Sequence, residues 1–314
     1  MKEFNDKTNK KKDLKNVTTF TVPFILNESK QAINISFKQS KEDIINEAFS
    51  YHAQGNISKA IKSYENFINQ GFKDPRVLAN YGSILSDLGK FEEAEKLNRK
   101  AIKLDPEFVN AHYNLGIILK GLNKFIEAEI STRKAIKLNP NFAEAYFSLG
   151  NILIDLGKLK EAEISLRKAI DLNPDLSLAY FNLGNTLNKL GNLEEAELLL
   201  RRAIELNPNS VEAYANLGNI LSKVGNLKEA ELLLRKAIEL NPNSAESHSN
   251  LGNILSEVGN LKEAELLLRK AIELNPKFAV GYSNLGNILR EIGNVKEAEV
   301  LLQKAIEINP CLAE

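Results

Sequence analysis

A fixed interval of 34 residues constrains this chain more than any other feature of its sequence. The stretch GNLKEAELLLRKAIELNP occurs twice, letter for letter, at residues 225–242 and 259–276, and a close variant occupies residues 191–208. This period is typical of stacked helix–turn–helix units, because one such unit cannot bury its apolar face without a neighbour. Prolines mark the interval at Pro106, Pro140, Pro174, Pro208, Pro242, Pro276 and Pro310.

Counting back from these prolines divides the chain into eight units, after an N-terminal segment of residues 1–40. The first unit is degenerate, with Phe72 where the proline is expected, and residues 313–314 begin an incomplete ninth unit. The predicted units are 41–74, 75–108, 109–142, 143–176, 177–210, 211–244, 245–278 and 279–312.

The residues of a single unit explain why it forms two helices. In unit 211–244 four apolar or small residues stand at i, i+3, i+4 and i+7, which places them on one face of a first helix. Gly225 then stands where a helix ends in the left-handed conformation, and Asn123, which replaces this glycine in one unit, tolerates that conformation. Pro242 ends the second helix, since proline cannot continue one.

This pattern resembles the tetratricopeptide repeat, and the resemblance covers about seven-eighths of the chain. It departs from the family in having no tryptophan, and the aromatic position holds Tyr, His or, in the second unit, Leu78. The resemblance implies an all-α, right-handed superhelical solenoid that acts as a protein–protein interaction scaffold. In unit 211–244 the family's residues are Tyr214, Leu217, Gly218, Leu221, Ala230, Leu234, Ala237 and Pro242.

The composition excludes several other classes. The 41 basic and 41 acidic residues balance, which argues against nucleic-acid binding and attachment to a charged membrane. The sequence has no apolar run long enough to insert in a membrane and no signal-peptide pattern, so we expect a cytoplasmic protein. The histidines and the single cysteine, Cys311, have no catalytic or metal-ligand spacing. We therefore expect no enzymatic activity, no cofactor and no metal site, and His112 and His248 occupy the aromatic packing position.

Residues 1–40 differ from the repeats, with eight lysines against four acidic residues. This segment is predicted to be largely disordered. Within it, VTTFTVPFILN at residues 17–27 is rich in β-branched and aromatic residues. Two interpretations stay open: it packs on the protein's own body, or it is a docking motif for a partner.

Two rows of asparagine suggest a binding groove. In the resembling family, the face of the first helix opposite the packed stripe lines the concave surface. Asparagine is a mediocre residue within a helix, and its amide both donates and accepts, so a row of them can pair with a peptide backbone. The candidate peptide-binding residues are Asn80, Asn114, Asn182, Asn216, Asn250 and Asn284 at the sixth place of a unit, and Asn151, Asn185, Asn219, Asn253 and Asn287 at the ninth.

The sixth-place row is similar to the asparagine ladder of the O-GlcNAc transferase family, and that resemblance implies peptide-backbone binding. Two other interpretations remain: the near-identical units are recent duplications, so the asparagines are not independent, and the amides bond between neighbouring helices. The family's clamp for the acidic C-terminus of heat-shock chaperones needs a lysine at the fifth place, where no unit has one. Tyr113, Phe147 and Phe181 stand at that place instead, as a weaker candidate for an apolar subsite or as packed core.

The last unit has no polar capping helix after Pro310, and uncapped solenoids expose apolar surface. We therefore expect Val295, Leu301 and Ile306 to leave apolar surface uncovered, which self-association, a partner or missing sequence would cover. The leading hypothesis for function is a scaffold that binds an extended peptide segment of a protein partner. The alternative is the substrate-recruiting part of a glycosyltransferase or sulfotransferase, like bacterial fusions of such repeats to a transferase, with the catalytic domain missing or on another chain.

Overall fold

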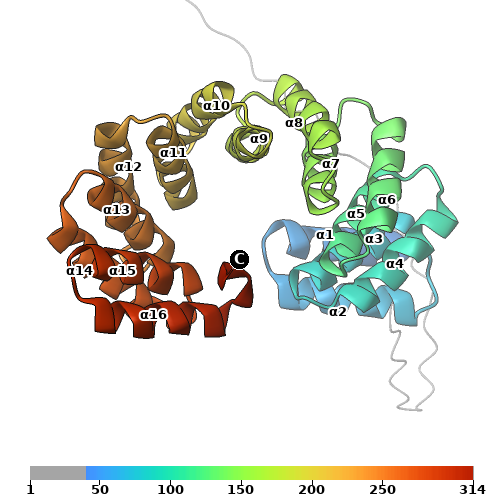
Figure 1. Ribbon diagram of the computed structural model, residues 1–314. Helices are drawn as coiled ribbons and strands as arrows, with labels where there is room; N and C mark the ends of the chain where they lie inside the picture. Colours follow the sequence, from blue (N-terminus) through green and yellow to red (C-terminus); the bar gives the residue numbers. More distant parts are fainter. Residues whose placement is uncertain (1–39, 314) are drawn as a thin grey trace, which may run out of the picture. The chain divides into compact units, whose positions relative to one another are not determined.

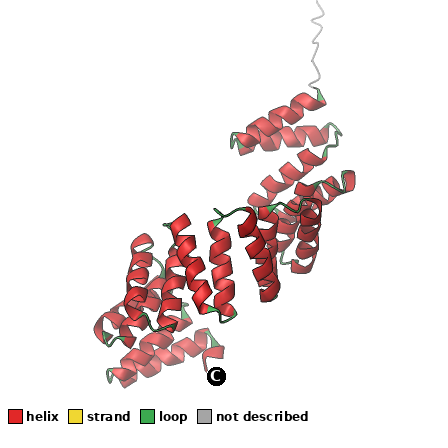
Figure 2. Ribbon diagram, turned by 90° about the horizontal axis from the view of Figure 1, so that it is seen from above, coloured by secondary structure: helices red, strands yellow, loops and turns green. Residues whose placement is uncertain are grey.

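The computed structural model describes residues 40–313, and within them all regular secondary structure is helical (Figure 2). The predictions for residues 1–39, including stretch 17–27, and for Glu314 fall outside the described residues. None of the helices in the described part is both long and apolar enough to cross a membrane. The helices are α1 Lys41–Ala53, α2 Ile57–Asn69, α3 Pro75–Asp87, α4 Phe91–Leu104, α5 Val109–Gly121, α6 Phe125–Leu138, α7 Ala143–Asp155, α8 Leu159–Leu172, α9 Ser177–Lys189, α10 Leu193–Leu206, α11 Val211–Lys223, α12 Leu227–Leu240, α13 Ala245–Glu257, α14 Leu261–Leu274, α15 Ala279–Glu291, α16 Val295–Ile308 and the 3-10 turn η1 Pro310–Ala313.

The helices pack in consecutive pairs, and the pairs stack on one another (Figure 1). Each odd-numbered helix packs on the even-numbered helix that follows it, and that helix packs on the next odd-numbered one. From α3 to α15 each odd-numbered helix also contacts the next odd-numbered helix, whereas the even-numbered helices have no comparable contact with one another. The row of pairs therefore curves towards its odd-numbered helices. The predicted all-α array of stacked helical repeats is confirmed.

In each pair from α3 to α16 the two helices approach closely at a glycine. A Cβ atom added to Gly218 on α11 would lie 2.9 Å from Cγ of Leu234 and 3.3 Å from the carbonyl oxygen of Ala230, both on α12. A side chain at this place would force the helices apart. Leu234 is fully buried against the glycine. The same pairing of glycine with leucine recurs at Gly150 and Leu166, Gly184 and Leu200, Gly252 and Leu268, and Gly286 and Leu302.

The turn within each pair has the backbone conformation that the sequence predicts. Gly225 has a φ of 83°, in the left-handed region that favours glycine. Asn123, at the equivalent turn, has a φ of 58° and is the one non-glycine residue with a positive φ among residues 40–313. The prediction that asparagine substitutes for the turn glycine is therefore confirmed.

Charged side chains connect successive pairs along the even-numbered helices. Arg201 on α10 lies 2.8 Å from Glu197 of its own helix and 2.7 Å from Glu229 on α12. The first contact joins residues four apart on one helix, and the second joins this helix to the next even-numbered helix. We call this set the arginine ladder; its members are Arg99, Arg133, Arg167, Arg201, Arg235 and Arg269.

Two pairs of helices have a polar residue where the five pairs from α7 to α16 have the packed leucine. Asn98 on α4 and Thr132 on α6 face Gly82 and Gly116, and both side chains are fully buried. The Asn98 amide nitrogen donates to the Ala94 carbonyl oxygen at 3.0 Å, but its Oδ1 atom has no partner within residues 40–313. A buried polar atom without a hydrogen bond costs about 1–3 kcal/mol, so these pairs are less favourably packed than their neighbours.

The C-terminal prediction is correct for one residue of three. Val295 is 60% exposed, but Leu301 and Ile306 are half-buried. Leu301 packs against the hydrophobic core that the last helix pair shares with the units before it, so its contacts come from within the array. The turn η1 packs on α16. Self-association through this end stays a prediction.

The arginine ladder predicts an acid-dependent loss of stability. The hydrogen bond from Lys158 and the charge of Arg133 hold the pKa of Glu129 below its ordinary value of 4.5. A lowered pKa means that Glu129 stabilises the fold above its ordinary pKa, and that this contribution is lost as pH falls through the folded-state pKa. We expect Glu129→Gln to lower the free energy of unfolding by less than about 1 kcal/mol near neutral pH, and the difference from the native chain to vanish in acid.

Unfolding midpoints measured across pH for the native chain, Glu129→Gln and the control Glu212→Gln test this. Glu212 is exposed and has no ion pair within residues 40–313. A constant difference between the native chain and Glu129→Gln at all pH values would contradict the account.

The packing of Asn98 predicts a stabilising substitution. Asn98→Leu keeps the shape of the side chain and removes the unbonded Oδ1 atom, so we expect the free energy of unfolding to rise by about 1–2 kcal/mol. Urea unfolding followed by circular dichroism measures it. The control Asn69→Leu makes the same change at an exposed position and should lie within about 0.5 kcal/mol of the native chain. A loss of stability in Asn98→Leu would refute this view of the core.

Candidate functional site

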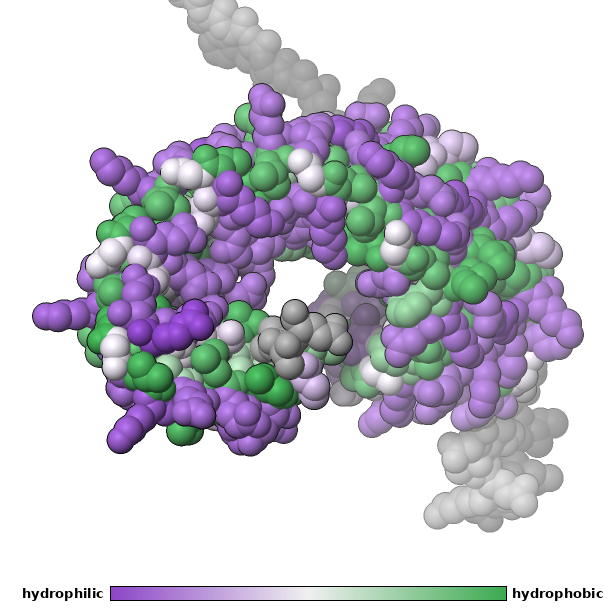
Figure 3. Space-filling view, in the orientation of Figure 1, coloured by the Kyte–Doolittle hydropathy of each residue, from purple (hydrophilic) through white to green (hydrophobic). Residues whose placement is uncertain are grey.

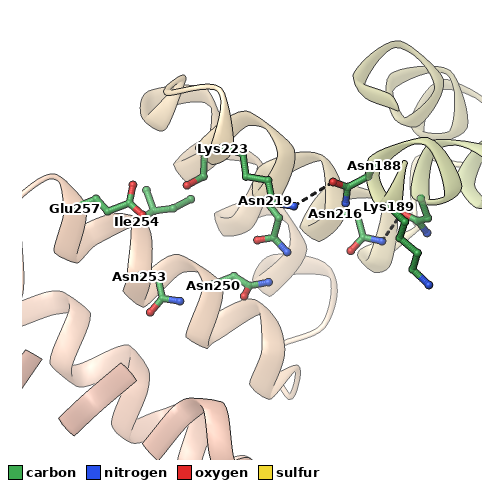
Figure 4. Close-up of a pocket in the computed structure, with 11 residues that line it drawn as sticks. Asn188, Lys189, Asn216, Asn219, Lys223, Asn250, Asn253, Ile254 and Glu257 are labelled. Atoms are coloured by element: carbon green, nitrogen blue, oxygen red, sulfur yellow. Dashed lines mark hydrogen bonds between the residues drawn. The ribbon is translucent and has the colours of Figure 1, made fainter. Parts of the chain in front are cut away.

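A groove on the odd-numbered helices gathers the predicted asparagines. It has a volume of about 530 Å³ and lies across α9, α11 and α13. In Figure 4 the side chains of Asn216, Asn219, Asn250 and Asn253 project from α11 and α13 into the space between the helices. In the space-filling view, hydrophilic residues border the inner side of the curve over these helices (Figure 3). The complete lining is Asn185, Asn188, Lys189, Asn216, Asn219, Ser222, Lys223, Asn250, Asn253, Ile254 and Glu257.

A smaller hollow continues the groove towards the N-terminal units. Its volume is about 280 Å³, and it shares Asn185 and Lys189 with the first hollow. Asn151 and Asn182 line it, together with Lys120 and Asp155, whose Nζ and Oδ2 atoms lie 3.3 Å apart. We call the two hollows together the asparagine groove, which extends from α5 to α13.

Four of the asparagines bond to one another across neighbouring helices. The Asn182 amide nitrogen donates to Oδ1 of Asn151 at 2.6 Å, and the Asn216 amide nitrogen donates to Oδ1 of Asn185 at 2.8 Å. In each bond a sixth-place residue reaches the ninth-place residue of the preceding unit. These amides therefore connect successive odd-numbered helices, as one of the sequence-based interpretations expects.

Three further asparagines also have partners within the array. The Asn114 amide nitrogen donates to the Ala79 carbonyl oxygen at 3.4 Å, and that of Asn284 donates to Oγ of Ser249 at 3.2 Å. Burial is the larger influence on the pKa of Tyr64 and raises it to about 12, while Asn80 interacts with the Tyr64 hydroxyl group and lowers that pKa. These residues lie outside the asparagine groove and support helix packing.

The remaining asparagines have no side-chain hydrogen bond within residues 40–313. They are Asn219, Asn250 and Asn253 in the groove, and the exposed Asn287 on α15. The Nδ2 atom of Asn250 is buried yet lacks an acceptor in this part of the chain. Asn250 occupies the same place as Asn182 and Asn216, but its amide does not reach Asn219 as theirs reach the preceding unit. The asparagines thus divide into a set with side-chain hydrogen bonds and a set without them in the described part of the chain.

The groove also holds charges that sequence reasoning largely missed. Lys189, Lys223 and Glu257 end α9, α11 and α13, and the Nζ atom of Lys223 donates to Oδ1 of Asn188 at 3.1 Å. These residues stand at the thirteenth place of their units. The sequence could have identified these charges as groove residues, because the sixth, ninth and thirteenth places lie at i, i+3 and i+7 on one helix face.

The three aromatic candidates are partly buried between helices. The Tyr113 ring packs on Phe142 with a centroid distance of 4.7 Å, and burial raises the pKa of Tyr113. Phe147 and Phe181 pack against the hydrophobic core that runs through the C-terminal units. None of the three lines the asparagine groove.

The two histidines at the aromatic position have structural partners. His112 Nε2 donates to the Pro106 carbonyl oxygen at 2.9 Å, and His248 Nδ1 donates to that of Ser244 at 2.8 Å. Both rings are buried. Within residues 40–313 no group of three His, Cys, Asp or Glu side chains is placed to hold a metal ion.

Several solved structures are similar to this chain. YrrB, described as a TPR protein with an unusual peptide-binding site, is 29% identical, with a TM-score of 0.51 over 59% of this chain and 95% of YrrB. The Cut9–Hcn1 complex, a hetero-tetramer of the APC/C, has a TM-score of 0.63 at 18% identity over 88% of this chain and 55% of its own. PilF of Pseudomonas aeruginosa has a TM-score of 0.57 at 19% identity, over 64% of this chain and 92% of its own. The similarities to Cut9–Hcn1 and PilF show the fold alone.

Matches to models of protein families identify the family to which the chain belongs. Two tetratricopeptide-repeat models match residues 82–123 and 109–142, and the model of the cilia and flagella-associated protein 70 C-terminal domain matches residues 131–313. These three models describe repeat domains and no catalytic domain. None of the curated proteins compared with the chain matches it. The chain is therefore a tetratricopeptide-repeat protein, and it belongs to the family of the cilia and flagella-associated protein 70 C-terminal domain.

Proposed function

We propose that this chain is a protein-interaction array that binds an extended peptide segment in the asparagine groove. The observation that carries the proposal is the set of three groove asparagines, Asn219, Asn250 and Asn253, that have no hydrogen-bond partner within residues 40–313. A primary amide offers two donors and an acceptor, which match the carbonyl and N–H groups of an extended backbone. Such contacts hold a peptide without reading its side chains.

The spacing of the helices suits an extended ligand. Packed helices lie about 8–10 Å apart, and an extended chain advances about 3.3 Å per residue, so about three peptide residues span one unit. An amide on each of α11 and α13 would therefore meet a backbone group at regular intervals. The similarity to YrrB supports this proposal, since that protein is described as having a peptide-binding site.

Two other predictions retain a place beside this one. The family match names cilia and flagella, so a ciliary or flagellar assembly is one setting for the array, and the cytoplasmic location expected from the sequence is another. The substrate-recruiting role for a glycosyltransferase or sulfotransferase, and the likeness to the O-GlcNAc transferase ladder, stay predictions.

Selection of a phage-displayed library of random linear peptides against the immobilised chain tests the proposed function. We expect enriched peptides whose affinity falls about tenfold or more in the triple variant Asn219→Ala, Asn250→Ala, Asn253→Ala, because several backbone hydrogen bonds of about 1 kcal/mol each are lost. The control triple variant Asn141→Ala, Asn209→Ala, Asn243→Ala removes three exposed loop amides and should bind normally. Equal affinity of the native chain and the groove variant would refute the proposal.

The division of the asparagines also predicts different effects on stability. Asn216→Ala removes an interhelical hydrogen bond and should lower the free energy of unfolding by about 1 kcal/mol. Asn250→Ala removes an amide that has no partner within the described residues, so its cost should be smaller. Urea unfolding of both variants measures the difference. A larger loss for Asn250→Ala than for Asn216→Ala would show that the two residues have been assigned to the wrong sets.

A further inference from the structure

The middle of the asparagine groove holds cations that have no carboxylate partner in the described chain. Lys120, at the N-terminal end of the groove, is paired with Asp155. Lys189 and Lys223 form no ion pair within residues 40–313, and the partner of Lys223 is the neutral amide oxygen of Asn188. Both lysine side chains belong to exposed residues at the groove. Their charges are therefore free to meet a ligand.

A buried hydrogen-bond donor lies beside the same hollow. Asn250 lines the hollow together with Lys189 and Lys223, and its buried amide nitrogen has no acceptor in the described part of the chain (Figure 4). An unmet buried donor is unfavourable, and a ligand oxygen would satisfy it. Ammonium and amide groups in one hollow favour a ligand rich in acceptor oxygens. A carboxylate is the strongest acceptor for such donors, because it is charged.

Two consecutive units have nearly identical sequences, and they differ at a residue that lines the groove. Residues 216–242 and 250–276 are identical except at one position, where Lys223 is replaced by Glu257. That single difference reverses a charge, and both side chains line the groove. The change gives the groove a positive middle, at α9 and α11, and a negative end, at α13.

We propose that the groove selects peptide segments with an acidic side chain, whose carboxylate lies between Lys189 and Lys223 while the Asn250 amide donates to an oxygen of the segment. Glu257 repels a second acid about three residues further along and favours a basic residue there. This charge pattern also sets the direction in which the segment lies. The inference rests on the proposed function, because it names the class of peptide that the groove binds.

Phage selection with a random linear peptide library tests the inference when it is run against matched variants. The native chain should enrich peptides with Asp or Glu, and Lys189→Glu with Lys223→Glu should enrich peptides with Lys or Arg instead. The control Lys228→Glu with Lys262→Glu makes the same change of net charge at exposed positions of α12 and α14. It should keep the acidic preference, and circular dichroism should show that all three proteins have the same helix content.

An acidic peptide from the native selection then allows a quantitative test. Its affinity should fall about tenfold or more in the Lys189→Glu, Lys223→Glu variant, remain unchanged in the control, and weaken as NaCl is raised. An equal loss in both variants would overturn the inference, because net charge would then explain the binding. Enriched peptides that need the asparagines but have no acidic preference would overturn it and leave the proposed function standing. A library that yields no enriched peptide would refute both.

Discussion

The close approach of two helices at a glycine is the constraint on which the rest of the structure depends. Gly218 allows α11 and α12 to meet at Leu234, where a Cβ atom on the glycine would lie 2.9 Å from the leucine Cγ atom. One pair still leaves part of its apolar stripe uncovered, so each pair needs a neighbour. Because the odd-numbered helices from α3 to α15 also contact one another, stacking places one polar face of each of them on the same surface. The groove is thus a consequence of how the core is packed.

The sequence predicts most of the fold because its period is an architectural signal. The turn at Asn123 and the glycine–leucine contacts follow from single residues and their spacing. The second partner of each ladder arginine does not, since it lies on another helix 28 residues away along the chain. The limits between units stay predictions, because the structure defines helices and not repeat boundaries.

The sequence predicts which helix face forms the candidate site, but not which of the asparagines on it form hydrogen bonds. Asn182, Asn216 and Asn250 stand at the same place of their units, yet two bond to the preceding unit and one has no acceptor in the described chain. Which way an amide turns depends on small differences in how neighbouring helices lie, and a repeat pattern does not contain these. The burial of Tyr113, Phe147 and Phe181 likewise depends on contacts with residues distant along the chain, such as Phe142 for Tyr113. The duplicated scaffold is informative in another way, because a difference such as Lys223 against Glu257 stands out against it.

The central claim is that the unbonded groove asparagines receive the backbone of a peptide ligand. Nuclear magnetic resonance of the side-chain amide groups, recorded as a selected peptide is added, tests this most directly. The account predicts that the Nδ2 resonances of Asn219, Asn250 and Asn253 shift on binding, while those of Asn182 and Asn216 keep their positions because their hydrogen bonds within the array persist. Binding that leaves the three groove resonances unchanged, and shifts amides on the even-numbered helices instead, would contradict it.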